Sequence, residues 1–252
     1  MITRRKFIAG SAAVTAGSAL AGPVGFRLPG AFTPRSIPNL KLWLDASQIT
    51  GLNDGDAVTT WSDLSGNGND ATQATGSKKP TYETSVVNGR PVVRGDGVDD
   101  VMFSTGATPT DGQPITVCVV TTVRAVTAFG YLFSGKASFG VAAYVNDSFS
   151  VNFSSTAYAG ASLSLAGATA YGTMGLMTFV YDGANSETYK NGVSSSSGDA
   201  GANAAAGLTL FNRYDEALPT PADVAEFVLY AGDLRGANLT ALHAYFMAKY
   251  GL

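Results

Sequence analysis

The sequence has few of the residues that build disulfides, metal centres and catalytic dyads: its 252 residues include one cysteine, one histidine and four glutamates. The single cysteine, Cys118, excludes an intrachain disulfide and a cysteine-rich zinc site. Its place in the apolar run ITVCVVTTV predicts a small, buried hydrophobic side chain. Charged residues make up 14% of the chain, which argues against long solvated helices, and a net charge of -3 offers no basic surface for a nucleic acid. After the N-terminal segment, no apolar run is long enough to cross a bilayer.

Turn-forming residues are abundant and lie between short β-branched runs. Between Trp61 and Phe103 there are two clusters, SGNGND at residues 65–70 and GDGVDD at residues 95–100, with Asn88 and Gly89 between them. Gly and Asn tolerate positive φ, whereas Val and Thr suit a pleated sheet. The stretch therefore predicts the opening strands of an antiparallel sheet.

The rest of the chain continues this alternation of strands and turns, and it ends in one helix. We expect strands at residues 40–45, 57–61, 81–84, 90–94, 98–104, 115–126, 131–134, 139–146, 149–154, 173–182, 187–190, 208–211 and 224–230, with a hairpin turn at Asp147 and a low-complexity loop at 194–206. Apolar residues at helical spacing predict a helix over residues 237–250, with Leu239, Leu242 and Phe246 facing the strands. The economical solution is an all-β fold, a two-sheet antiparallel jelly-roll sandwich with one C-terminal helix, in a single domain.

The N-terminus resembles an export signal. Arg4 and Arg5 precede a small, apolar, uncharged run that ends in Ala19-Leu20-Ala21, and the paired arginines resemble the twin-arginine type. We expect residues 1–21 to be a signal cleaved after Ala21, residues 22–39 to be a Pro/Gly-rich linker, and residues 40–252 to be the folded domain. This predicts a chain exported to the periplasm, the cell surface or the medium. The alternative is an uncleaved arm that docks a phage structural protein into a virion.

Five stretches carry a resemblance to a known family. They are LKLWLDAS at residues 40–47, DLSGNGNDA at 63–71, GDGVDDVMF at 95–103, EFVLYAGDL at 226–234 and AYFMAKYGL at 244–252. In this order they resemble the LamG-like jelly-roll domains of the concanavalin A-like lectin and glucanase superfamily. The resemblance implies the sandwich fold. It does not choose a function, because that superfamily hosts lectins, adhesion modules, glycosidases and structural modules.

The sequence lacks the carboxylates that the resemblance would require of a hydrolase. Glucanase relatives carry two Glu and an Asp at alternate positions of one strand, and two carboxylates must flank a scissile glycosidic bond. Here each Glu stands alone, Glu226 matches a structural position of the family, and the aspartates of residues 95–100 lie in a turn. His243 falls within the terminal helix, where a surface or capping role is expected. We therefore predict that the chain is not an enzyme.

Calcium is the cofactor that the composition favours. Flexible loops rich in Asp, Asn and Gly supply the oxygen ligands that Ca²⁺ prefers, although the same residues can simply form Asx-turns. Two sets could bind a structural Ca²⁺: one comprises Asp63, Asn67, Asn69 and Asp70, and the other Asp96, Asp99 and Asp100.

A non-catalytic module would need a ligand surface. Sugars are bound by aromatic faces and planar polar groups. The candidates for such a surface are Tyr131, Tyr144, Tyr158, Arg213 and Asp215, whereas Trp43 and Trp61 are assigned to packing. The predicted function is an exported, non-catalytic carbohydrate- or protein-recognition and adhesion module, whose partner is a glycan or a surface protein. The alternatives are a phage virion structural protein, as a tail or capsid-surface module that assembles or oligomerises, and a glycan hydrolase.

Overall fold

The computed structural model describes residues 32–104, 112–125, 129–135, 141–148, 152–165, 169–205 and 207–252. The predicted export signal, with Arg4 and Arg5, lies outside these residues. Residues 32–252 form one compact unit.

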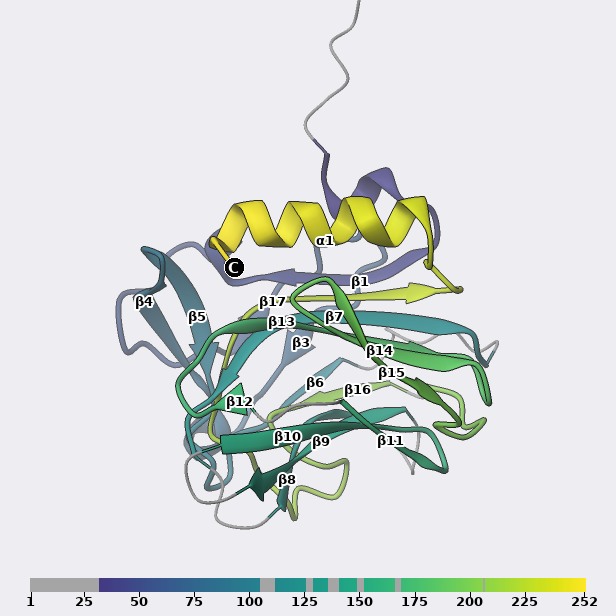
Figure 1. The fold of residues 1–252 in the computed structure, drawn as a ribbon. Coiled ribbons are helices and arrows are strands. Elements are labelled where there is room, and N and C mark those ends of the chain that lie inside the picture. Colours follow the sequence, from purple (N-terminus) through teal and green to yellow (C-terminus); the bar gives the residue numbers. More distant parts are fainter. Residues whose placement is uncertain are drawn as a thin grey trace, which may run out of the picture. The chain divides into compact units, whose positions relative to one another are not determined.

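Two antiparallel sheets form the unit, which confirms the predicted fold class (Figure 1). The first sheet has eight strands in the order β15 (Val193–Gly198), β14 (Ser186–Lys190), β13 (Gly175–Tyr181), β7 (Ile115–Val123), β17 (Ala222–Ala231), β5 (Arg90–Arg94) and β4 (Thr81–Val87), and β1 (Leu40–Asp45) also pairs with β17. The second has nine strands in the order β11 (Ser162–Ser164), β10 (Asn152–Tyr158), β9 (Ala142–Ser148), β8 (Phe129–Ser134), β16 (Leu208–Leu210), β6 (Met102–Ser104), β3 (Ala71–Thr72) and β2 (Thr60–Trp61), with β12 (Thr169–Ala170) beside β10.

The space between the sheets is filled by one hydrophobic core. Phe133 of the second sheet contacts Phe179 and Phe227 of the first in edge-on geometry, with ring centroids 5.8 and 5.4 Å apart. All three side chains are at most 1% exposed. Trp61 is also buried in this core, as predicted. The inner faces thus bury large aromatic side chains, which dominate core energetics.

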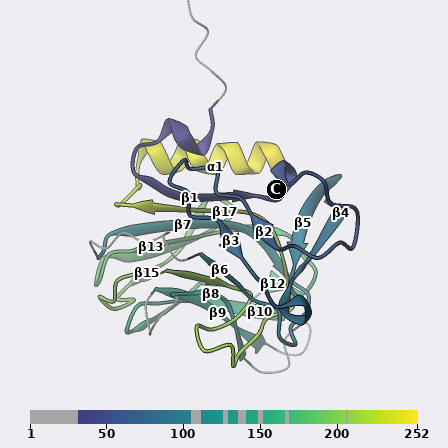
Figure 2. The same ribbon diagram turned by 180° about the vertical axis from the view of Figure 1, so that it is seen from behind.

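A second core lies on the outer face of the eight-stranded sheet, beneath the helix α1 (Ala237–Tyr250). Leu239, Leu242 and Phe246 are buried there, which confirms the predicted helix and its apolar face. Figures 1 and 2 both show α1 lying along β1 and β17. The helix ends at Tyr250, and Gly251 caps it in the left-handed conformation with φ 66°.

Strand β7 is buried on both sides because it lies between the two cores. Val117 and Val119 face the inter-sheet core, whereas Cys118 and Val120 face the helix. Every residue of the run ITVCVVTTV is therefore buried, its three threonines included, and Cys118 is buried, as predicted.

Three local predictions were wrong. The serine-rich stretch at the start of the predicted loop 194–206 forms the edge strand β15, which pairs with β14 through backbone hydrogen bonds and needs no apolar pattern. In the segment predicted as a strand at 98–104, only Met102–Ser104 is a strand. Asp147 lies within β9, paired with Phe153, and is not a turn.

Part of the segment expected to be a linker packs against the sandwich. Pro34–Ser36 forms the 3-10 helix η1, and Pro34 and Ile37 are buried. Phe32 lies 6.0 Å from the Tyr245 ring of α1, centroid to centroid. Two further 3-10 helices, η2 (Ala46–Gln48) and η3 (Gly76–Lys78), follow β1 and β3. In the described part of the chain, no helix is long and apolar enough to cross a membrane.

Candidate functional site

Three aspartates gather in the loop of residues 95–100, which connects β5 to β6 and is called the acidic loop below. Two glycines fix its path. A Cβ on Gly97, which has φ 82°, would lie 2.6 Å from Pro221 Cδ, and a Cβ on Gly95 would lie 2.7 Å from Phe211 Cδ1. A side chain at either position would therefore displace the loop from β17 and β16.

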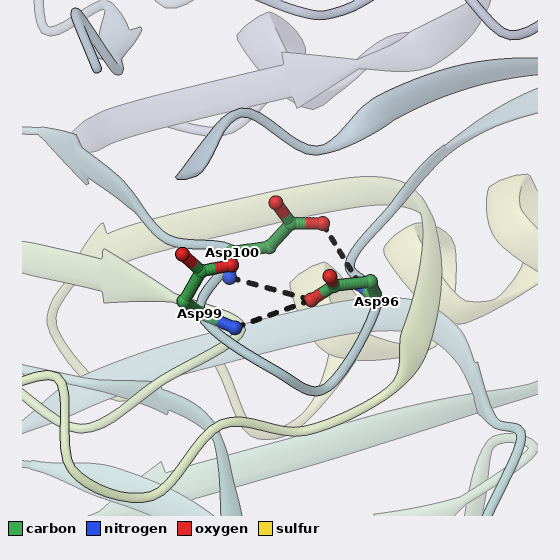
Figure 3. A group of neighbouring side chains, drawn as sticks. All are labelled: Asp96, Asp99 and Asp100. Carbon is green, nitrogen blue, oxygen red and sulfur yellow. Dashed lines mark hydrogen bonds between the residues drawn. The ribbon is translucent and has the colours of Figure 1, made fainter. Parts of the chain in front are cut away.

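Hydrogen bonds within the loop hold the carboxylates in place (Figure 3). Asp96 Oδ1 accepts the backbone N–H groups of Val98, at 2.8 Å, and of Asp99 and Asp100, both at 3.4 Å. Asp100 Oδ2 in turn accepts the Asp96 N–H at 2.8 Å. Carboxylate oxygens from Asp96, Asp99 and Asp100 lie within 4.8 Å of one another. Among the residues that the structure describes, this is the one such group of three.

The three carboxyl groups differ in environment. Asp96 is exposed and Asp99 half-buried, whereas Asp100 is only 5% exposed. Burial raises the pKa of Asp100 to about 6, and the neighbouring charges of Asp96 and Asp99 act in the same direction. The loop therefore places a buried carboxyl group that can hold a proton near pH 6 beside one exposed and one half-buried aspartate.

The donor set of the acidic loop also fits a hard divalent cation. Only Asp96 Oδ1 and Asp100 Oδ2 accept hydrogen bonds from backbone N–H groups of the described residues, which leaves further carboxylate oxygens of the three aspartates that could coordinate an ion. Calcium takes oxygen ligands of this kind at surface loops.

The other set of residues predicted for calcium is already occupied by hydrogen bonds. The Asp63 carboxylate accepts four backbone or side-chain donors, including the Trp43 N–H at 3.0 Å and the Asn69 N–H at 3.0 Å. The amide nitrogens of Asn67 and Asn69 donate to backbone carbonyls of β1. Asp70 Oδ1 accepts the Asp63 N–H at 2.8 Å. These residues brace the loop against β1, as the alternative of Asx-turns predicted.

The structure brings together three of the five predicted ligand residues. The Arg213 guanidinium lies 6.0 Å from the centroid of the Tyr131 ring and forms an ion pair with Asp215 at 2.6 Å. Tyr158 is half-buried in β10, two strands from Tyr131. Tyr144 belongs to β9, but its side chain lies outside the described part of the chain.

The prediction of a surface or capping role for His243 was wrong. The ring is 7% exposed, with Nε2 3.0 Å from Thr178 Oγ1 and its centroid 5.4 Å from that of Tyr189. Burial lowers the pKa of His243 to about 4. The residue is a packing element between α1 and the sheet, because its helix face points inward.

Sequence reasoning missed a buried charge cluster between α1 and β1. Glu226 is fully buried and accepts hydrogen bonds from Trp43 Nε1 at 2.6 Å, Tyr245 at 2.9 Å, Tyr250 at 2.8 Å and Lys249 Nζ at 2.7 Å. Lys249 Nζ also lies 2.5 Å from Asp45 Oδ2. Because every Glu226 oxygen is engaged and inaccessible, this residue is structural and does not meet a substrate.

A pocket of about 550 Å³ opens beside this cluster, between η1, β1, η2, β5 and α1. Trp43, Tyr245, Arg35 and Arg90 contribute to its wall. Its size falls within the range of small-molecule sites. No local sequence signal could reveal it, because its residues come from five separate elements.

Comparison with known proteins identifies the fold. No family model and no curated protein matches the sequence. Among solved structures, Trypanosoma rangeli sialidase matches with a TM-score of 0.58 at 13% identity, over 81% of this chain and 32% of that one. An arabinofuranosidase complexed with arabinofuranosyl-α-1,2-xylobiose matches with a TM-score of 0.57 at 14% identity, over 77% of this chain and 51% of that one. The chain thus spans about a third of the sialidase and half of the arabinofuranosidase.

These neighbours contradict two predictions: that the chain is a non-catalytic recognition module and that it is not an enzyme. Both structures belong to glycoside hydrolases, and both contain this sandwich. The absence of paired carboxylates on one strand therefore does not exclude catalysis, because a loop can bring carboxylates together as well as a strand can. At these identities, the comparisons show that the chain has a β-sandwich fold that occurs in glycoside hydrolases.

Proposed function

We propose that this chain takes part in glycan hydrolysis and that the acidic loop supplies the acid and the nucleophile. One observation carries the proposal: Asp100 is buried, with its pKa raised to about 6, beside the half-buried Asp99 and the exposed Asp96. A carboxyl group that its environment keeps protonated, beside a second carboxyl group, is the arrangement that glycosidases use. The occurrence of the fold in a sialidase and an arabinofuranosidase supports a glycan as the substrate.

The spacing of the carboxylates favours a retaining mechanism. Their oxygens lie within 4.8 Å of one another, close to the roughly 5 Å of retaining enzymes and below the separation of about 6.5–9.5 Å that inverting enzymes need for a water. Protonated Asp100 would donate its proton to the glycosidic oxygen as the bond to the anomeric carbon breaks. The Asp99 carboxylate, which accepts no hydrogen bond from the described residues, would attack that carbon and form an ester. Water deprotonated by Asp100 would then hydrolyse the ester.

The pH dependence of hydrolysis tests this role. Because Asp100 must be protonated to act as the acid, kcat/KM is expected to fall as the pH rises through about 6. The measurement is a kcat/KM profile from pH 4 to 8 on a panel of aryl glycosides and polysaccharides. Glu187→Gln and Glu216→Gln serve as controls, since neither residue belongs to the loop, and both should keep the profile. Absence of turnover on the whole panel, or a profile that rises through pH 6, would contradict the proposal.

A structural Ca²⁺ at the same loop is a second proposal, supported by the free oxygens of the three aspartates, and it predicts the opposite pH dependence. Calcium needs ionised carboxylates, so binding should strengthen as the pH rises through about 6 and Asp100 loses its proton. At a hundredfold excess over Kd, Ca²⁺ is expected to raise the Tm by roughly 5–10 °C at pH 7.5 and by much less at pH 5.

Thermal unfolding with and without Ca²⁺, with chelator as the blank, measures this shift. Asp99→Asn should remove the shift. Asp63→Asn should retain it, because Asp63 is occupied by hydrogen bonds to β1 and the neighbouring loop. A shift lost only in Asp63→Asn would place the ion in the other loop instead.

We also propose that the chain is a LamG-like member of the concanavalin A-like superfamily, on the basis of the five sequence stretches named in the sequence analysis.

Export by a twin-arginine signal remains a prediction, since Arg4 and Arg5 lie outside the described residues. N-terminal sequencing of the mature protein tests it, with Gly22 as the expected first residue.

A further inference from the structure

Two arginines in the described part of the chain differ from the others. Arg94, Arg124, Arg213 and Arg235 each form an ion pair with an aspartate. Arg35 and Arg90 form none, and both line the 550 Å³ pocket beside α1, called the arginine pocket below. In a chain with a net charge of -3, two uncompensated guanidinium groups thus meet at one pocket.

Each of the two guanidinium groups is held in place by one hydrogen bond that its Nε donates. Arg35 Nε donates to the Leu64 carbonyl at 2.5 Å, and Arg90 Nε donates to the Lys249 carbonyl near the end of α1 at 2.7 Å. The Nη nitrogens of both residues have no acceptor among the described residues. A guanidinium anchored through Nε has lost part of its rotamer freedom, so its remaining N–H groups are prepared to bind a planar anion in a bidentate manner.

The other charged groups at the pocket pair with one another, with two carboxylates sharing one ammonium group. Asp45 also lines it, but its carboxylate accepts the Ser47 N–H at 2.9 Å and pairs with Lys249 at 2.5 Å. Lys249 is shared with buried Glu226. With Arg35 and Arg90 added, these groups carry one excess positive charge, and the two guanidinium groups are the cations without an ion pair among the described residues.

Two half-buried aromatic residues complete the wall. Trp43 is fixed by its bond from Nε1 to Glu226, and Tyr245 is fixed by its hydroxyl on the same carboxylate. Rigid aromatic side chains beside planar polar groups suit a sugar ring better than a bare inorganic ion.

We infer that the arginine pocket binds a carboxylate-bearing sugar, with Arg35 and Arg90 on the carboxylate and Trp43 and Tyr245 on the ring. The choice of a sugar rests on the proposed function; the preference for an acid rests on the arginines. The pocket is separate from the acidic loop. Arg90 is the first residue of β5 and Asp96 follows the end of this strand. The two residues are six positions and at most about 20 Å apart along the chain, a span that one oligosaccharide could bridge.

Binding, not turnover, tests this inference. Full-length protein is titrated against an array in which each uronic acid-containing oligosaccharide is paired with its neutral methyl ester. The acid is expected to bind at least tenfold more tightly than its ester in one or more pairs. Arg35→Gln and Arg90→Gln should each weaken binding of the acid by about tenfold to a hundredfold and leave binding of the ester unchanged. Arg235→Gln is the control, because this arginine is already paired with Asp182. It should change binding of neither the acid nor the ester.

The outcomes separate the inference from the proposed function. A chain that binds acids but hydrolyses nothing supports the arginine pocket and contradicts only the role of the acidic loop. Equal affinity for acid and ester in every pair, or a preference that survives in the double Arg35→Gln, Arg90→Gln variant, would overturn the inference. If inorganic sulfate displaced the acidic sugar at the same concentration, the inference that the pocket recognises a sugar ring would be overturned.

Discussion

Replacement of Asp100 by Asn is expected to lower the kcat/KM of glycan hydrolysis by about 10²–10⁴-fold, the usual contribution of a general acid. The amide has nearly the same shape, and its oxygen can still accept the Asp96 N–H that now binds Asp100 Oδ2 at 2.8 Å. It cannot give a proton to a leaving group. The change therefore removes the chemistry and keeps the loop.

Stability distinguishes this loss of chemistry from unfolding. The folded pKa of Asp100, about 6, lies above the ordinary value of 3.8, so its contribution to stability is fully present below pH 3.8 and is lost as the pH rises through about 6. At pH 7.5 the charged side chain is unfavourable in the fold, and Asp100→Asn should be at least as stable as the parent chain in urea unfolding. Val98→Ala, at a side chain of the same loop that is 74% exposed, should retain both activity and stability. Activity within tenfold of the parent chain in Asp100→Asn would exclude Asp100 as the acid.

The fold could be predicted from sequence wherever burial leaves a periodic pattern. The helix over Ala237–Tyr250 shows one apolar face, and β1 shows alternating leucines. The edge strand β15 shows neither, because its serines contribute only backbone hydrogen bonds. Periodicity reports which side chains are buried, so a polar edge strand has no signal of its own.

The acidic loop was visible in the sequence because its three aspartates are neighbours in the chain. Sequence could not show that one of them would be buried, and this difference in burial is what changes its pKa. The arginine pocket was not visible at all. Arg35, Trp43, Arg90 and Tyr245 come from separate elements, which meet only when α1 packs on the sheet.

Lys249→Met is expected to destabilise the fold by about 3–5 kcal/mol, the usual cost of removing one partner from a buried ion pair. Asp45 and Glu226 are 3% and 0% exposed, and Lys249 is the cation within 4 Å of both. Without it, two carboxylates would remain in the interface between α1 and β1 with only neutral donors. Since a domain is typically stable by about 5–15 kcal/mol, the variant should lose a large fraction of its free energy of unfolding, measurable in urea.

The loss should depend on pH in a definite direction. Burial has the largest effect on Glu226 and raises its pKa. The charge of Asp45 raises this pKa further, whereas Lys249 lowers it. Without Lys249, the pKa of Glu226 should rise further, so the fold tolerates this carboxyl group better when it is protonated. The destabilisation should therefore be larger at pH 8 than at pH 5.

The control is Lys79→Met, at a half-buried lysine with no ion pair among the described residues. It should change the free energy of unfolding by less than about 0.5 kcal/mol. In the double variant Glu226→Gln, Lys249→Met, the loss should be smaller than the sum of the two single losses, because only one carboxylate, that of Asp45, is then left without its cation. Additive losses would mean that Lys249 stabilises α1 by its packing alone and that the charge cluster contributes nothing.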